Sequence, residues 1–542
     1  MKISPTDIFN EYQSAVDFKE GIGNKGLFEQ SKINERFFIG DQWYGARCGA
    51  ERPLVRHNII KRIGEFKMSQ ITANPVEVVY SADGVPTTEN VRSSVREFKS
   101  KIANAPDFAF SGAPDTDEIN VITSALSDYH KVTAERVHLD SLLYKALKDS
   151  YISGSGIIYT YWKGDINTGT FADNDGAVQI KGDIACEVLK ISDVAFGDPY
   201  EEELERQPYI IISARRNADE VRCEAEYSGV AYSEISNINP DGDDGKVLVL
   251  TKLYKEYNEH GDYKIKCVKV TKNATVRRPY NTGLNLYPLA VFRFEERGGL
   301  AYGESEITHL IPNQIAINRM ITASVWAAMT MGMPLMVVNG DTVTGEITND
   351  PGQIIKIYGS NEDVSGAVKY ITPPDFCSDF IGSVNNLIDN TLTQSGANAA
   401  ALGDSDPNNA SAIMALRNSA LMPLNLLKSR FNVFIEQISR IWADFWITQY
   451  GNRRLKIRDA NGVWYLPFCA ERYSGLYLNA RVDIVDNSTG TVGRIGVLDS
   501  LYEKGIIDKT QYLKRLPAGA VPDLNELIGE INNGEAKAVD GK

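Results

Sequence analysis

Two stretches of the 542-residue chain decide its fold class. They are SEITHLIPNQIAINRMITASVWAAMTM at residues 305–331 and SAIMALRNSALMPLNLLKSRFNVFIEQISRIWADFWITQY at residues 411–450. The second stretch repeats apolar residues three or four apart, at Phe431, Phe434, Ile438, Ile441 and Phe445. This spacing predicts the longest helix of the chain, with one face in a core. Pro423 predicts a kink within it.

The chain between these stretches predicts a small β-containing insert and a return helix. Residues 332–374 have the pattern of short strands and turns, and residues 375–395 have helical spacing. Residues 396–410, GANAAALGDSDPNNA, are small and polar and indicate a loop. No charged residue occurs from Met320 to Gly340, which leaves a membrane span open as an alternative. Ala, Met, Gly and Pro in that run favour a helix packed against other helices.

The flanking regions differ in character. The first 75 residues or so predict helices, one of them ending at Gly40. Residues 117–148 predict one long helix, and residues 156–300 predict a β-rich body with a turn at His260-Gly261-Asp262. A strand pair is expected near residues 455–468 and 482–485, and residues 493–531 predict short helices. The fold class is therefore α+β.

Composition narrows the function classes. The chain has 57 Lys+Arg and 71 Asp+Glu, a formal net charge of −14. Such acidity excludes a protein that holds nucleic acid through a basic patch. The six cysteines lie far apart, so neither a disulfide scaffold nor a thiolate zinc site is expected. The first twenty residues lack the apolar segment of a signal peptide, and we expect reduced intracellular chemistry.

Motifs for catalysis or cofactor binding are weak. Residues 21–26, GIGNKG, match GxGxxG, but the helical pattern before them favours a link between helices. There is no GxxxxGK[ST] loop and no GxSxG elbow, and the five histidines are isolated. Residues 241–245, DGDDG, lack the ligand spacing of a calcium loop and indicate a hairpin turn. We therefore expect no catalytic residues, no cofactor and no metal.

Several phrases resemble the portal proteins of tailed double-stranded DNA bacteriophages, in the order in which they occur there. They are RFFIGDQW at 36–43, RPLVRHN at 52–58, VAFGDP at 194–199, YPLAVF at 287–292, GESE at 303–306 with Gln314 and Asn318, LYEKGII at 501–507 and LKRLP at 513–517. The order helix, β insert, helix, loop, long kinked helix over residues 304–450 resembles the same family. The GDP at 197–199 departs from its more usual aspartate-proline phrasing.

The resemblance implies a division of the chain into portal regions. It implies a mixed α/β wing at 1–303, with its β-rich body from about 156, and a first stem helix at 304–331. It implies a clip at 332–374, a second stem helix at 375–395 and a channel loop at 396–410. The long helix and the return to the wing would cover 411–490, and a helical crown 491–542.

The resemblance also implies a function and partners. The chain would form a ring, usually of twelve subunits, at one capsid vertex of the virion after assembly in the host cytoplasm. The ring would pass double-stranded DNA without sequence specificity, and contact terminase, capsid and scaffold proteins and a neck adaptor, without catalysing a reaction. The alternative is a membrane-associated pore or scaffold that uses residues 320–340.

Three groups of residues are implied as sites. The channel loop would present Leu402, Asp404, Ser405, Asp406, Asn408 and Asn409 to DNA. The stem would contact neighbouring subunits through Asn318, Ala323, Ala327, Ala328, Asp379 and Asn386. The clip would dock terminase and the adaptor through Asp341, Thr344, Glu346, Asp350, Glu362 and Asp363.

The charge is concentrated where DNA would pass. Residues 304–410 contain twelve acids and three bases, so this segment carries −9 of the net −14. Lys and Arg contacts to phosphates release counterions and bind DNA tightly. A base-poor lining is therefore suited to a channel through which DNA slides. The alternative for individual acids is a place on a solvated outer face.

Overall fold

The computed structural model describes 4–44, 53–73, 76–82, 116–171, 179–331, 335–338, 341, 343, 358, 368–371, 377–397, 421–459, 462–473, 476, 478–484, 498–505, 507–508 and 511–513. These residues form a mixed α+β structure with several sheets, as the sequence predicts. The chain divides into two compact units, and each is described by itself. Unit 1 comprises Met1–Met68, Asp140–Tyr159 and Cys186–Arg430, and unit 2 comprises Ser69–Leu139, Thr160–Ala185 and Phe431–Lys542.

Unit 1 is built around an antiparallel sheet of five strands in sequence order. The strands are β4 (Val194–Phe196), β5 (Tyr209–Asn217), β6 (Lys246–Tyr257), β7 (Tyr263–Val270) and β8 (Thr275–Asn281). The predicted turn at residues 260–262 joins β6 to β7, and Gly261 there has a φ of +87°. Short 3₁₀ turns at Ile191–Asp193 and Leu204–Arg206 flank β4.

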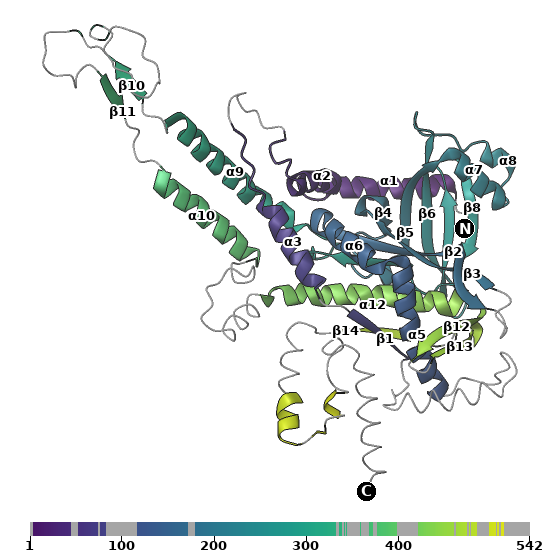
Figure 1. Cartoon of the computed structure of the whole chain (residues 1–542). Helices are drawn as coiled ribbons and strands as arrows, with labels where there is room; N and C mark the ends of the chain where they lie inside the picture. The colour runs from purple at the N-terminus through teal and green to yellow at the C-terminus, as the bar shows by residue number, and fades with distance from the viewer. Residues whose placement is uncertain are drawn as a thin grey trace. The chain divides into compact units, whose positions relative to one another are not determined.

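Helices cover both faces of this sheet (Figure 1). Leu250 in β6 packs with Ile8 of α1 (Pro5–Gly21) on one face. On the other face, Val247 and Val249 of the same strand pack with Val221 of α7 (Ala218–Tyr227), beside the short α8 (Tyr232–Ile235). Side chains alternate between the two faces of a strand, so β6 contributes to both cores.

The remaining helices of unit 1 surround the start of α9 (Glu306–Met331). They are α2 (Gly26–Ile39), α6 (Leu139–Ser153), α10 (Cys377–Gln394) and most of α3 (Ile59–Ile71). As predicted, α2 ends at Gly40, whose φ of +95° accommodates the left-handed helix terminus. The strands β10 (Leu335–Val338) and β11 (Val368–Ile371) pair antiparallel between α9 and α10.

Two long strands belong to both units. They are β2 (Ser155–Phe171) and β3 (Gln179–Leu189). Within unit 1, the first residues of β2 pair with β9 (Leu289–Arg293), in the register Ser155 with Arg293. Within unit 2, Phe171 of β2 pairs with Arg454.

Unit 2 contains α5, most of α12 and two strand pairs. The elements are β1 (Val76–Ala82), α5 (Thr116–Val137), α12 (Leu424–Gln449), β12 (Asn452–Asp459), β13 (Gly462–Cys469), α13 (Ala470–Tyr473) and β14 (Leu478–Ile484). The predicted aromatic stripe of α12 is confirmed, because Phe434, Ile438 and Phe445 are all buried. Trp442 and Trp446 are buried beside it and contact the rings of His130 and Tyr129 from α5.

Three predicted elements need correction. The single helix expected at 117–148 is two helices, α5 and α6, because His138 between them has a φ of +54°. Residues 452–469 form a hairpin of their own, and β14 pairs instead with β1. The kink expected at Pro423 is a turn at residues 422–423, after which α12 begins. Proline lacks the amide hydrogen that a continuous helix would need there.

Candidate functional site

The first turn of α9 is fixed to the body of unit 1 through Ser305. Its Oγ donates to the Tyr151 carbonyl at 2.6 Å and accepts from the amide of Ile307 at 3.2 Å. Next to it, the Gly303 amide donates to Ser155 Oγ at 2.9 Å. A Cβ on Gly303 would lie 2.3 Å from the Gly154 carbonyl oxygen, so the two backbones meet where only glycine fits. Gly154 and Gly303 therefore serve close packing of the backbone here.

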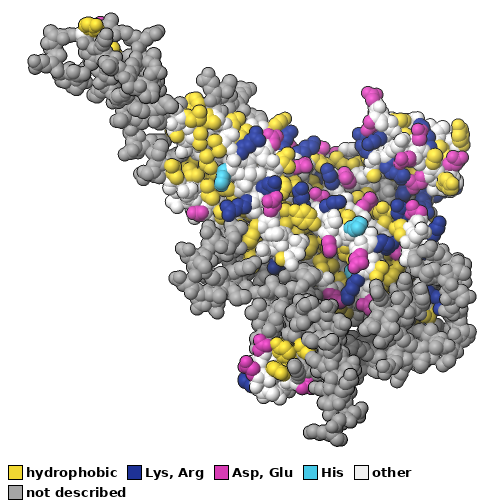
Figure 2. Space-filling view, viewed as in Figure 1, with side chains coloured by type: hydrophobic (Ala, Val, Ile, Leu, Met, Phe, Trp, Pro, Cys, Tyr) yellow, Lys and Arg dark blue, Asp and Glu magenta, His cyan; other side chains and the backbone are white. Residues whose placement is uncertain are grey.

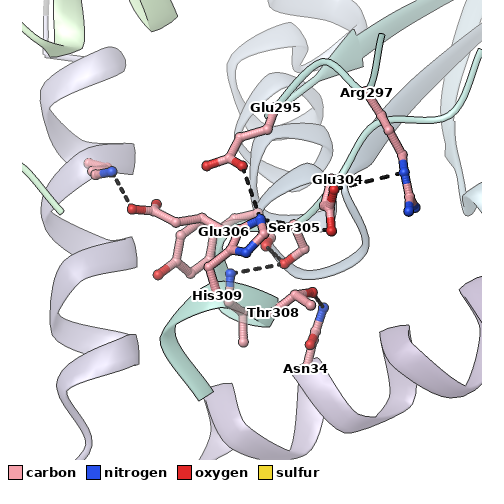
Figure 3. A network of polar contacts seen from close by, with 11 residues as sticks. Asn34, Glu295, Arg297, Glu304, Ser305, Glu306, Thr308 and His309 are labelled. Carbon is pink, nitrogen blue, oxygen red and sulfur yellow. Dashed lines mark hydrogen bonds and ion pairs between the residues drawn. The ribbon is translucent and has the colours of Figure 1, made fainter. Parts of the chain in front are cut away.

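A polar network surrounds this first turn (Figure 3). Asn34 of α2 donates through Nδ2 to Thr308 Oγ1 at 3.2 Å. Lys67 Nζ lies 2.5 Å from Glu306 Oε1, and both side chains are largely buried. Burial raises the pKa of Glu306, and the nearby ammonium of Lys67 opposes that shift. The buried pair thus holds α3 to the start of α9.

A histidine and two glutamates lie on the exposed side of the same turn. His309 Nε2 is 3.6 Å from Glu295 Oε2 and 3.8 Å from Glu304 Oε1. Arg297 Nε lies 3.9 Å from Glu304 Oε2. Among the residues that the structure describes, no group of His, Cys, Asp or Glu is arranged to hold a metal ion.

Farther along α9, three side chains spaced four residues apart bind backbone amides between Val55 and Ile59, the first residue of α3. The amide of Ile59 donates to Gln314 Oε1 at 2.9 Å, that of His57 to Asn318 Oδ1 at 3.0 Å, and that of Val55 to Thr322 Oγ1 at 3.2 Å. Four helical residues rise about 6 Å, and two extended residues, as from Val55 to His57, about 6.6 Å. The chain then turns, because the Ile59 amide also donates to the His57 carbonyl at 3.0 Å. The two periods match closely, so successive helix side chains meet alternate backbone amides. We call these three side chains the α9 ladder.

Two of the three ladder residues are buried, and further hydrogen bonds cross-link them. Gln314 and Asn318 are each 2% exposed. Gln314 Nε2 donates to the His57 carbonyl at 2.6 Å, and Asn318 Nδ2 donates to Gln42 Oε1 at 2.6 Å. Trp43 Nε1 donates to the Val55 carbonyl at 3.0 Å. The ladder therefore joins the first half of α9 to the segments on both sides of residues 45–52.

After Asn318 the surroundings of α9 change. From Arg319 to Met329, none of the described side chains is buried, and Met329 is 64% exposed. Figure 2 shows apolar side chains gathered over this part of α9. No described helix of the chain is long and apolar enough to cross a membrane.

α9 and α10 pack as an antiparallel pair. Asn313 Nδ2 near the start of α9 donates to Thr391 Oγ1 near the end of α10 at 3.3 Å. Val384 and Leu392 of α10 are buried, whereas Asn386 and Asp389 are exposed. With β10 and β11 at its other end, the pair forms two long helices joined by a small β insert (Figure 1).

The structure separates the expected stem residues into two kinds. Ala323, Ala328 and Asn386 are exposed and Ala327 is partly exposed, so they are accessible on the single chain. Asn318 is buried, and its side-chain hydrogen bonds stay within the chain. Asn318 therefore belongs to the α9 ladder. Its side-chain amide already has hydrogen-bond partners in its own subunit. Asp379 lies in α10, but its side chain is outside what the structure describes.

Most of the other predicted site residues lie outside the described residues. Of the clip residues, only Asp341 is described, and it is exposed. The others outside are Thr344, Glu346, Asp350, Glu362 and Asp363 of the clip, and Leu402, Asp404, Ser405, Asp406, Asn408 and Asn409 of the channel loop. Thr322 and Gln42 are not among the site residues predicted from the sequence. The spacing of Gln314, Asn318 and Thr322, four residues apart, was the available signal.

Comparison with known proteins gives likeness in solved structures only. A chain from the neck of an empty gene transfer agent particle is 11% identical, with a TM-score of 0.36, over 85% of this chain and 90% of that one. A chain from the virion of a native gene transfer agent particle is 10% identical, with a TM-score of 0.37, over 93% of this chain and 99% of that one. No family model and no curated protein matches the chain.

Proposed function

We propose that the chain is a phage portal subunit, and that copies of it form a ring at one capsid vertex through which double-stranded DNA is packaged and ejected. The observation that carries the proposal is the antiparallel α9–α10 pair with the β10–β11 pair between its helices. This order corresponds to the two-helix stem and clip that the sequence resemblance implies. The pair is attached to a mixed α/β body, which corresponds to the wing.

The composition of α10 supports passage of DNA. The helix contains no Lys or Arg. It therefore adds no cation that could hold a phosphate to the stem. In the proposed ring, DNA slides past this stem without being gripped.

The second half of α9 supports assembly from copies of the chain. A run of small and apolar side chains that stays exposed in one chain is a candidate for burial against another protein. A cyclic ring needs two different faces of each subunit to meet. Ala323 and Ala328 lack long side chains and would allow a neighbouring helix to approach closely.

The resemblance suggests what the ring would contact. In this proposal the clip docks the terminase motor and later the neck adaptor, and the wing faces capsid and scaffold proteins. The packaging ATPase belongs to the terminase partner, and the ring itself acts as a non-enzymatic conduit in the virion.

The functional test is packaging with a shortened channel loop. We expect removal of residues 398–408 to leave ring assembly intact and to reduce the amount of nuclease-protected DNA in particles. A matched deletion in the exposed β6–β7 turn, residues 259–261, should leave packaging unchanged. Normal DNA content and retention in particles built with the loop deletion would contradict the proposal.

A further inference from the structure

The groove between α2 and α9 carries positive charges that form no ion pair with the residues that the structure describes. This cavity of about 590 Å³ is lined by the basic residues Lys25, Lys32, Arg36 and Arg319 and by two acids, Glu29 and Asp41. None of the four bases takes part in an ion pair among the described residues. The groove is thus positive in a chain whose net charge is −14.

Apolar side chains and stacked rings form the rest of the groove. Phe37 and Ile315 belong to its lining, and the Arg36 guanidinium stacks on the Tyr44 ring at 3.4 Å from its centroid. Tyr44 is 69% exposed although it lies beside these residues. A mixture of aromatic, arginine and aliphatic side chains is typical of the centre of a protein interface.

The matching negative charge lies on α10. Asp389 is exposed and forms no ion pair among the residues that the structure describes. It is surrounded on the exposed face of α10 by amides, Asn385, Asn386 and Asn390, and Ile381 farther along is 48% exposed. This face offers a carboxylate, hydrogen-bonding amides and one apolar side chain to a partner.

The two surfaces lie on opposite sides of the helix pair. Asn313 and Thr391 mark the sides on which α9 and α10 face each other. At 3.6 residues per turn, Ile315 and Arg319 lie about 160° and 120° around α9 from Asn313. Asp389 lies about 160° around α10 from Thr391. One chain cannot bring its own Arg319 and Asp389 together, but the next chain in a ring can present one to the other.

The heights of the two charges along the helix pair also agree. Measured from the Asn313–Thr391 contact towards the β10–β11 pair, Arg319 lies roughly 9 Å along α9 and Asp389 roughly 3 Å along α10. Rotation about an axis parallel to the helices leaves these heights unchanged. The remaining offset of about 6 Å is within the reach of an extended arginine side chain.

We propose that the α2–α9 groove of one subunit receives the exposed face of α10 from a second copy of this chain, with Arg319 and Arg36 facing Asp389. The inference rests on the proposed ring and specifies the two faces that close it. It makes α10 bifunctional, with one side packed on α9 of its own subunit and the other in the groove of the neighbour. Acidic residues elsewhere in the chain are the competing occupants, and the experiment distinguishes them.

The test exchanges the two charges in the full-length chain. We expect Arg319→Glu and Asp389→Arg, each alone, to raise the protein concentration at which half of the chains are in rings by roughly tenfold or more, because like charges then meet. The double variant should return to near the wild-type value. Arg278→Glu is the matched control and should assemble normally, because Arg278 on β8 is exposed and forms no ion pair within the described part of the chain. Mass photometry measures the ring fraction, and thermal melting establishes that each variant is folded.

A cross-link provides a second readout that does not depend on the charge variants folding well. A short bis-maleimide should join Arg319→Cys/Asp389→Cys chains into a ladder up to the closed ring, above the background of the two single-cysteine variants. A wild-type chain that forms no ring would contradict the proposed function. If the wild-type chain forms rings, normal assembly of Arg319→Glu would overturn this inference and leave the proposed function standing. The absence of cross-linked oligomers of the double-cysteine chain would do the same. A double variant no better than the singles would assign Asp389 no part in the contact.

Discussion

The helices α9 and α12 are both 26 residues long, but their side chains differ in burial. In α12, every side chain from Ile441 to Ile447 is buried within the chain. In α9, burial stops at Asn318, and the described side chains from Arg319 to Met329 all remain accessible. A helical segment buried on all sides stabilises its own unit. A helix buried for half its length has a free half to contribute to an assembly.

The most damaging change should be in the α12 core. Trp446 is fully buried, with its ring centroid 5.6 Å from that of Tyr80 and 5.8 Å from that of Tyr129. We expect Trp446→Ala to lower the free energy of unfolding by about 3–5 kcal/mol, because it leaves a large cavity. Chemical denaturation measures this loss. A loss below about 1 kcal/mol would show that the core of unit 2 does not depend on α12.

The same core should make stability depend on pH. Burial, and to a lesser extent the charge of Lys131, lowers the pKa of His130 from 6.5 to about 3. Between pH 6.5 and about pH 3, His130 is therefore protonated in the unfolded chain but neutral in the folded chain. Stability from this group is complete above pH 6.5 and falls by about 1.4 kcal/mol per pH unit below it.

The variant His130→Gln isolates that contribution. We expect the difference in unfolding free energy between wild type and His130→Gln to shrink as the pH falls from 6.5 towards 3. Because both proteins share every other titrating group, the difference reports on His130. A pH-independent difference would mean that His130 is protonated in the fold, against the buried position beside Trp442.

A smaller loss is expected at the α9 ladder. Gln314→Ala removes the acceptor of the Ile59 and Ile60 amides and the donor to the His57 carbonyl. The unfolding free energy should fall by about 1–3 kcal/mol. The Ile60 amide loses its side-chain acceptor, and the Ile59 amide and His57 carbonyl keep only their bond to each other. Asn386→Ala, exposed on α10, is the control and should change it little. Equal effects of the two variants would contradict the role of the ladder, and differential scanning calorimetry compares them directly.

The smallest effect on folding should come from the free half of α9. Met329→Ser replaces a side chain that is 64% exposed, so we expect a change within about 0.5 kcal/mol. The same variant should assemble less completely, because a polar side chain would be buried against the neighbour. Sedimentation velocity measures assembly and urea melting measures folding. A large folding defect with normal assembly would mean that the second half of α9 serves the fold of its own subunit and not the assembly.

The sequence predicted those features that a local pattern determines. The apolar spacing of α12, the Gly40 helix end and the turn at residues 260–262 depend on neighbours in the chain, and all three are confirmed. The break at His138 was missed because the apolar pattern continues through it, and only the backbone conformation shows the interruption. The pairing of β14 with β1 was missed because it joins segments about 400 residues apart, and strand patterns do not name their partners.

The candidate site was only partly accessible to sequence reasoning. The resemblance assigns Gln314 and Asn318 to the entry of the stem, and Asn318 also to its subunit contacts. Their use within the chain follows from the match between the helical and extended periods, which requires residues 53–58 to lie along α9. The exposure of Arg319 and Asp389 on opposite sides of a helix pair likewise required the register of α9 and α10.

The most direct test of the account is electron microscopy of the purified full-length chain. We predict a closed ring in which α9 and α10 surround a central channel wide enough for duplex DNA, with Met320–Met329 covered by the neighbouring subunit. The aromatic core around Trp442 and Trp446 should be unchanged within each subunit. A monomer or dimer under all conditions, with the second half of α9 still exposed to solvent, would contradict the account.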